Sequence, residues 1–158
     1  MAEQLTILEN YLAYFKALAA KHKEIKHFEH GPSERIIAST RSKTTYPMFW
    51  LETPGFQFGD NGGNVTGTPM GAFIIAMQAS PAKPEEQDAA WCKTQKWTLA
   101  FLARMKKDAR VMGFRIDFNK VVTEAISPLW VDNLHGWRTE FTILDTLDVC
   151  HDFSQWND

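Results

Sequence analysis

The feature that most constrains the fold of this chain is an amphipathic stretch between residues 85 and 112. Its apolar side chains recur at helical spacing and fall within roughly 140° of arc. They are Ala90, Trp91, Trp97, Phe101, Leu102, Met105, Ala109 and Met112. Acidic residues stand in the first turn and basic residues in the last, the order that the helix dipole favours. The stretch predicts a helix from Glu85 to Met112, ended by Gly113, that buries one face.

A second apolar stripe predicts a helix at the start of the chain, from Gln4 to about His27. It runs through positions three and four apart, namely Leu5, Leu8, Leu12, Phe15, Ala19 and His22. Gly31-Pro32 would end this helix, since glycine can adopt the left-handed cap and proline cannot continue a helix.

Short β-branched and aromatic runs predict strands on both sides of the second helix. Three precede it, at residues 35–40, 45–52 and 72–79, and two alternating segments follow it, at about 114–126 and 137–143. We therefore expect one α+β domain over residues 1–158. Its antiparallel sheet of about five strands would carry the N-terminal helix and the second helix packed across it. The expected core includes Leu8, Leu12, Phe15, Ile37, Phe49, Ile75, Phe101, Ile116, Phe141 and Ile143.

The segment 53–71 holds six of the nine glycines and two of the seven prolines. Such a composition predicts a long, flexible hairpin loop rather than a regular element, with Phe56 and Phe58 extending a strand at its base. We expect this mobile loop to become ordered on docking to a partner. Its interface residues would be Phe56, Phe58, Asp60, Asn61, Gly62, Gly63 and Asn64.

The overall composition excludes several classes of protein. A hydrophobic fraction of 44% and a charged fraction of 23% are typical of globular chains. The net charge of −2 argues against sequence-specific nucleic-acid binding. No apolar run approaches the ~18 residues of a membrane span, and the acidic N-terminus does not resemble a signal peptide. We expect a soluble protein that is cytoplasmic or associated with a particle.

No cluster of side chains predicts a metal site, a cofactor or a catalytic centre. His22, His27 and His30 lack a third ligand at helical spacing, and the two cysteines fit neither a disulfide framework nor a zinc pattern. The acidic tail with Asp145, Asp148, His151 and Asp152 is read as solvated, as are the strand carboxylates Asp117, Glu124 and Glu140. The glycine-rich loop lacks the lysine and hydroxyl residue of a phosphate-binding loop. We predict a protein that is not an enzyme.

Charge is segregated along the chain. Residues 83–112 carry a net charge of +3, and residues 113–158 carry a net charge of −5. Five basic residues share one 120° arc of the second helix, by roughly 100° per residue. They are Lys93, Lys96, Arg104, Lys107 and Arg110. These residues form either an ordinary solvated helix face or a basic ridge that meets the acidic strands of a neighbouring copy. The second alternative is a head-to-tail contact, which gives a ring when it closes.

The order of elements resembles the tail-terminator and tail-completion proteins of long-tailed bacteriophages and prophage-derived particles. The resemblance rests on the helix at 4–27, the strand TYPMFWLE at 45–52, the glycine-rich loop at 53–71 and the strand GWRTEFTILD at 136–145. It implies a small α+β subunit that assembles into hexameric rings joining the phage tail to the head. It implies no catalytic residues, and its expected partners are copies of this chain and tail or head-tail proteins.

Two other functions compete with this interpretation. One is a small-ligand-binding or enzymatic cone similar to nuclear-transport-factor-2-like proteins, in which Trp50, Trp130 and Trp137 would line a pocket. That family usually opens with several helices, whereas one helix precedes the strands here. The other is a dimeric adaptor.

Overall fold

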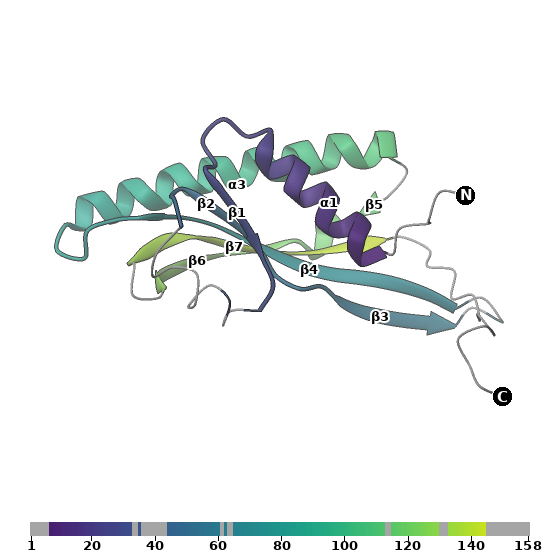
Figure 1. The fold of residues 1–158 in the computed structure, drawn as a ribbon. Helices are drawn as coiled ribbons and strands as arrows, with labels where there is room; N and C mark the ends of the chain where they lie inside the picture. Colours follow the sequence, from purple (N-terminus) through teal and green to yellow (C-terminus); the bar gives the residue numbers. More distant parts are fainter. Residues whose placement is uncertain are drawn as a thin grey trace.

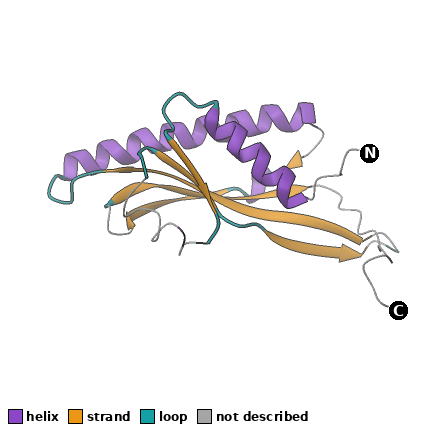
Figure 2. Cartoon of the chain, in the orientation of Figure 1, coloured by secondary structure: helices purple, strands orange, loops and turns teal. Residues whose placement is uncertain are grey.

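The structure is a computed structural model of the chain, and it describes residues 7–32, 35, 44–60, 62, 65–112, 115–129 and 133–144. Within these ranges two helices lie on one side of a seven-stranded sheet (Figures 1 and 2). The predicted α+β class, with an N-terminal helix and a second helix packed across the sheet, is confirmed. The sheet has more strands than the five expected, and it is mixed rather than antiparallel because one of its pairings is parallel.

The long helix α3 spans Pro84–Met112, one residue more than predicted. Pro84 occupies the first helical position, where the missing N–H is not needed, and Glu85 and Glu86 follow in the first turn. The predicted apolar face is the buried one, and α3 packs mainly on β7 and β4.

The first helix, α1, spans only Ile7–Ala20, so the prediction that it continues to His27 is wrong. Residues His27–His30 instead form strand β1, which pairs in parallel with β2, Met48–Leu51. This pairing places the Phe28 ring 5.9 Å from the Phe49 ring, a tertiary contact that overrides the local helical pattern. The strand expected at 35–40 lies outside the described residues, apart from Arg35.

Two long strands form the centre of the sheet. β4, Val65–Gln78, pairs antiparallel with β7, Leu134–Leu144, from Met70↔Thr142 to Gln78↔Leu134. The order across the sheet is β1-β2-β4-β7-β5, with β3 also pairing with β4 and β6 also pairing with β7. The remaining strands are β3 at Gly55–Asp60, β5 at Arg115–Ile116 and β6 at Val122–Leu129.

The prediction that 53–71 is a loop is wrong for most of its length. β3 pairs with the first half of β4 in unbroken register, from Gly55↔Met70 to Asp60↔Val65. The glycines alternate with aromatic and β-branched residues that favour strands, and the long partner strand outweighs the glycine content. We call β3 together with residues 65–70 of β4 the arm, which projects beyond the helix-covered part of the sheet (Figure 1).

The strand expected at 114–126 is also interrupted. After β5 the chain forms a short 3₁₀ helix, η1, at Phe118–Lys120, capped by the Asp117 carboxylate, which accepts a hydrogen bond from the amide of Asn119. β6 then continues through Ser127 and Pro128, where a register irregularity replaces the predicted break. The closing strand predicted at 137–143 is confirmed as the central part of β7.

The main core lies between the sheet and the two helices. The Phe15 ring of α1 lies 6.1 Å from Phe49, 6.4 Å from Phe73 and 5.3 Å from Phe141. Of the predicted core residues, those buried are Phe15, Phe49, Ile75, Phe101 and Phe141. Those packed against the core while partly exposed are Leu12, Ile116 and Ile143.

Two of the predicted core positions need separate mention. Leu8 is 39% exposed, so its assignment to the core is wrong. The first turn of α1 reaches past the packed part of the sheet toward the base of the arm (Figure 1). Ile37 lies outside the described residues.

The helix-free face of the sheet carries a second apolar cluster, which the sequence pattern does not predict. Its buried members are Met48, Trp50, Ile74, Ala76 and Leu134. Continuous apolar runs in β2 and β4 therefore reflect burial on both faces.

Candidate interaction surfaces

The predicted basic ridge exists as an exposed surface of α3. Lys93, Lys96, Arg104, Lys107 and Arg110 are all exposed, along about 26 Å of helix at 1.5 Å per residue. Arg104 also belongs to an ion pair within the chain, because its Nε donates to Asp108 Oδ1 at 2.7 Å.

The acidic strand surface that should meet this ridge is not found on the described strands. Between 115 and 144 the described charges balance: Arg115, Lys120 and Arg138 stand against Asp117, Glu124 and Glu140. Several of these charges are already paired, as in Lys120–Asp117 and Arg138–Glu140. The acidic excess comes from Asp132 and residues 145–158, which lie outside the described residues.

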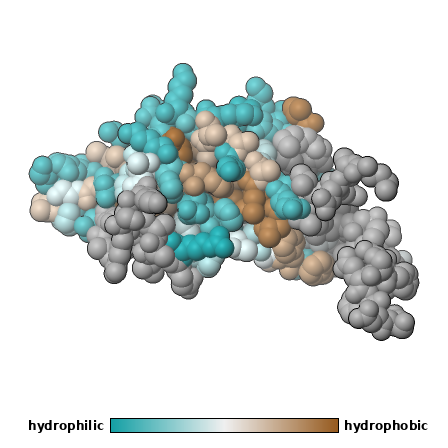
Figure 3. Space-filling model, viewed as in Figure 1, coloured by the Kyte–Doolittle hydropathy of each residue, from teal (hydrophilic) through white to brown (hydrophobic). Residues whose placement is uncertain are grey.

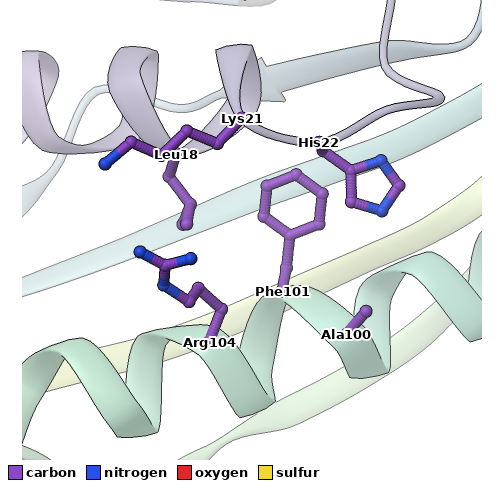
Figure 4. A pocket seen from close by; sticks show the side chains of 6 residues that line it. All are labelled: Leu18, Lys21, His22, Ala100, Phe101 and Arg104. Carbon is purple, nitrogen blue, oxygen red and sulfur yellow. The ribbon is translucent and has the colours of Figure 1, made fainter.

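A cleft separates the end of α1 from the middle of α3. One hollow of about 160 Å³ is lined by Leu18, Lys21, His22, Ala100, Phe101 and Arg104 (Figure 4). A neighbouring hollow of about 210 Å³ shares three of these residues, Leu18, Lys21 and Arg104. It adds Tyr14, Ala17 and Asp108. We call the two hollows together the helix cleft.

The helix cleft combines an apolar floor with a cationic rim. The buried side chains of Leu18 and Phe101 approach each other across it, and the charged ends of Lys21 and Arg104 lie on the same side of Leu18 (Figure 4). The His22 ring stacks on Phe101 at 4.9 Å, and burial lowers the pKa of this imidazole although Glu24 opposes the shift. His22 is therefore uncharged at neutral pH.

Asp108 holds one end of the helix cleft together. It accepts hydrogen bonds from the Tyr14 hydroxyl at 3.3 Å and from Arg104. Burial, followed by the nearby Asp108 charge, raises the pKa of Tyr14, so the phenol stays protonated as a donor. The sequence could not indicate this link, since Tyr14 and Asp108 are far apart along the chain.

The arm carries two aromatic side chains on one face, a half-buried Phe56 and an exposed Phe58. Phe56 pairs with Pro69 and Phe58 with Gly67, so both rings lie on the same side of the arm as the helices, with centroids 6.5 Å apart. Phe58 is 62% exposed. Figure 3 shows apolar surface gathered near α1 and the base of the arm, bordered by hydrophilic residues.

The other predicted loop residues fall at or beyond the end of the arm. Asp60 ends β3 and is exposed, and Gly62 is exposed with a φ of 71°, a left-handed conformation that suits glycine. Asn61, Gly63 and Asn64 lie outside the described residues.

A charge cluster lies on the helix-free face at the root of the arm. Arg138 of β7 donates to both carboxylate oxygens of Glu52, at 2.6 and 2.9 Å, and to Glu140. The hydrogen bond to Glu52 is the main cause that raises the pKa of Arg138 above its ordinary value. A hollow of about 340 Å³ adjoins the three side chains and Lys120. Glu140 is paired with Arg138 and Asp117 caps η1, so each of these two carboxylates already has a partner within the chain.

The tryptophans proposed to line one pocket do not share a face of the sheet. Trp50 pairs with Ile74, and Ile74 pairs with Arg138, so the three side chains lie on the same face of the sheet. This is the helix-free face, and Trp50 is buried there. Trp137 is aligned with Ile75 and donates its indole N–H to the carbonyl of Trp91 on α3, at 2.9 Å. Trp130 lies outside the described residues.

Among the described residues, no three histidine, cysteine, aspartate or glutamate side chains group as metal ligands would. In the same part of the chain, no helix combines the length and the apolar character needed to span a bilayer. No protein-family model matches the chain, and a search of curated proteins gives no match either.

Proposed function

We propose that this chain is a non-enzymatic structural subunit that assembles with copies of itself into a ring, as the resemblance to phage tail-terminator proteins implies. The observation that carries the proposal is the arm, a ribbon that leaves the body of the fold with the Phe58 ring exposed. It replaces the flexible loop on which the sequence analysis placed the contact.

The arm would gain stability from a partner surface. A two-stranded ribbon is marginally stable in water unless its apolar face packs on something. Among the described residues, positions 65–69 of β4 pair only with β3. Burying a phenylalanine side chain is worth roughly 1.5–3 kcal/mol, so contact between Phe58 and another surface would stabilise the arm and the assembly together.

The arm and the basic ridge of α3 are different surfaces of one molecule. A contact that joins the arm of one copy to another region of the next is heterologous, and its repetition gives a closed ring or an open filament. Exposed ion pairs contribute only about 0–1 kcal/mol each, so the ridge would set orientation while aromatic contacts supply most of the affinity.

The first prediction tests the arm. Phe58→Thr should weaken self-association about tenfold, because it removes the exposed ring while keeping a residue suited to a strand. Val122→Thr is the matched control, since Val122 is 48% exposed on β6, a strand that does not pair with the arm. Light scattering over a range of concentrations measures both variants, and electron microscopy shows whether the assembly is a ring.

Two results would count against the proposal. A wild-type chain that stays monomeric at every concentration contradicts self-assembly. A two-fold dimer indifferent to Phe58→Thr favours the adaptor alternative. Gene order tests the phage assignment separately, since neighbouring capsid, portal or tail genes support it and metabolic genes support the ligand-binding alternative.

A further inference from the structure

We infer that the helix cleft is the docking site for the C-terminal segment, residues 145–158, of a neighbouring copy. This inference rests on the proposed self-association and names one of its contacts. It also replaces the acidic strands, whose described charges balance, as the partner of the basic residues of α3.

The helix cleft has the chemistry to take an aromatic side chain flanked by carboxylates. Its floor of Leu18 and Phe101 is apolar, and its hollows of about 160 and 210 Å³ share three lining residues. Lys21 and Arg104 stand on one rim, and Lys107 and Arg110 extend the positive charge along α3. His22 is uncharged at neutral pH and stacks on the floor, so it adds apolar surface rather than charge. Asp108 is the acidic group in the lining, and Arg104 already pairs with it.

The C-terminal segment matches this chemistry. Its sequence, DTLDVCHDFSQWND, contains four aspartates and no lysine or arginine. Phe153 follows Asp152 directly, and Trp156 lies two residues before Asp158. An aromatic ring on the floor would therefore bring a carboxylate to the cationic rim.

The direction of β7 favours a neighbouring copy over the same molecule. Leu134 pairs with Gln78, shortly before α3 begins, and Leu144 pairs with Arg115, shortly after α3 ends. β7 therefore runs along α3 from its first turn to its last, and at Leu144 the chain heads away from Arg104. Docking in the cleft of the same molecule would require the chain to reverse its direction after Leu144, so we assign the segment to the cleft of a neighbouring copy.

The test is a charge exchange between two full-length variants. The cleft variant carries Lys21→Glu and Arg104→Glu, and the tail variant carries Asp152→Lys and Asp158→Lys. Each alone places like charges together, so each should self-associate about tenfold or more weakly than wild type. A 1:1 mixture restores opposite charges in both kinds of contact, so light scattering should show association recovered only on mixing. Circular dichroism confirms that each variant is folded.

The outcomes separate this inference from the proposed function. If wild type assembles and both variants assemble equally well, the inference is wrong while the proposed function stands. If each variant fails and the mixture fails too, docking on a neighbouring copy is overturned.

A second measurement avoids the charge reversal at Arg104, which could affect folding through Asp108. Ala100→Trp fills the exposed helix cleft without changing charge. It should abolish binding of a fluorescein-labelled peptide of residues 145–158 in fluorescence anisotropy, and Ala103→Trp, exposed on the same helix outside the lining, should not. Equal binding of the peptide by both variants would contradict the helix cleft as its site, even if the chain forms rings. If the chain binds the peptide but never assembles, the inferred docking site stands and the proposed ring does not.

Discussion

At the scale of single residues, two threonines on the sheet-facing side of α3 differ in the hydrogen bonding of their hydroxyl groups. Thr94 and Thr98 are both fully buried, one helical turn apart. The Thr94 hydroxyl donates to the Ala90 carbonyl at 2.7 Å, whereas the Thr98 hydroxyl finds no hydrogen-bond partner among the described residues. A buried hydroxyl without a partner costs about 1–3 kcal/mol, so Thr98 is a site at which the native residue destabilises the core.

Thr98→Val should therefore raise the free energy of unfolding by about 1 kcal/mol, because valine keeps the shape and removes the unpaired hydroxyl. Urea denaturation measures the change. Thr98→Ser is the control, and it should destabilise the fold, since it keeps the hydroxyl and loses a methyl group. A valine variant less stable than wild type would show that the hydroxyl has an acceptor after all.

The burial of these two threonines can be predicted from the sequence. At 100° per residue, Thr94 and Thr98 fall inside the apolar arc of α3, so their burial follows from the helical pattern. Which hydroxyl finds an acceptor depends on rotamer and local packing, which the pattern does not encode. The same is true of Arg138 and Glu52, whose pairing depends on the order of strands across the sheet.

At the scale of elements, Gly71 shows how α1 is joined to the root of the arm. A Cβ atom at Gly71 would lie 2.3 Å from the Tyr11 hydroxyl oxygen and 2.8 Å from Phe141 Cζ. Tyr11 itself donates to the Glu52 carbonyl at 3.5 Å, so one ring of α1 covers Gly71 and reaches the segment that leads into β3. The glycine is required here by close packing rather than by backbone conformation.

Gly71→Ala should destabilise the chain by about 1–3 kcal/mol, because it displaces the Tyr11 ring. Tyr11→Phe removes the oxygen that the new methyl group meets first. The double variant should thus be more stable than the sum of the two single effects predicts, and a double-mutant cycle by thermal or urea unfolding measures the coupling. Strict additivity would mean that Phe141, not Tyr11, takes up the clash.

The elements that can be predicted well from the sequence are those whose secondary structure follows from their own hydrophobic periodicity. α3 was predicted to within one residue because 29 residues of helical pattern leave no competing structure. β1 was missed because four residues, His27–His30, become a strand only through their pairing with β2. The glycine content of 53–71 predicts a loop because it reflects only the preferences of each segment alone. The segment forms the arm because β3 pairs with β4, and these pairings are not visible in the composition.

At the scale of the whole molecule, the sheet has a firm centre and an exposed extension. Residues 73–76 of β4 are paired on both sides, with β2 and with β7, and lie beneath the helices. β3 pairs with β4 along one side of the arm, and its residues are mostly exposed. Local opening should therefore be easiest in the arm, which has few buried apolar contacts.

Hydrogen exchange provides the test at this scale. In dilute wild-type chain, amides of β3 should exchange faster than those of residues 73–76, and they should become protected at concentrations at which the chain assembles. Phe58→Thr should remove that concentration-dependent protection. Strong and equal protection of the arm in the isolated monomer would contradict both the loose arm and its role as the contact surface.

The pairing of β4 with β7 has a consequence for how the chain is made. The two central strands are separated by roughly fifty to seventy residues, and α3 lies between them in the sequence. During synthesis, at about 5–20 residues per second, β4 leaves the ribosome seconds before the strand that completes its other edge. Throughout that interval Phe73 and Ile75 lack β7 beside them, and for its first part they also lack α3 above them. Incomplete chains that end before Leu134 therefore carry an open apolar edge, and the sheet is completed only after Leu134–Leu144 have been synthesised.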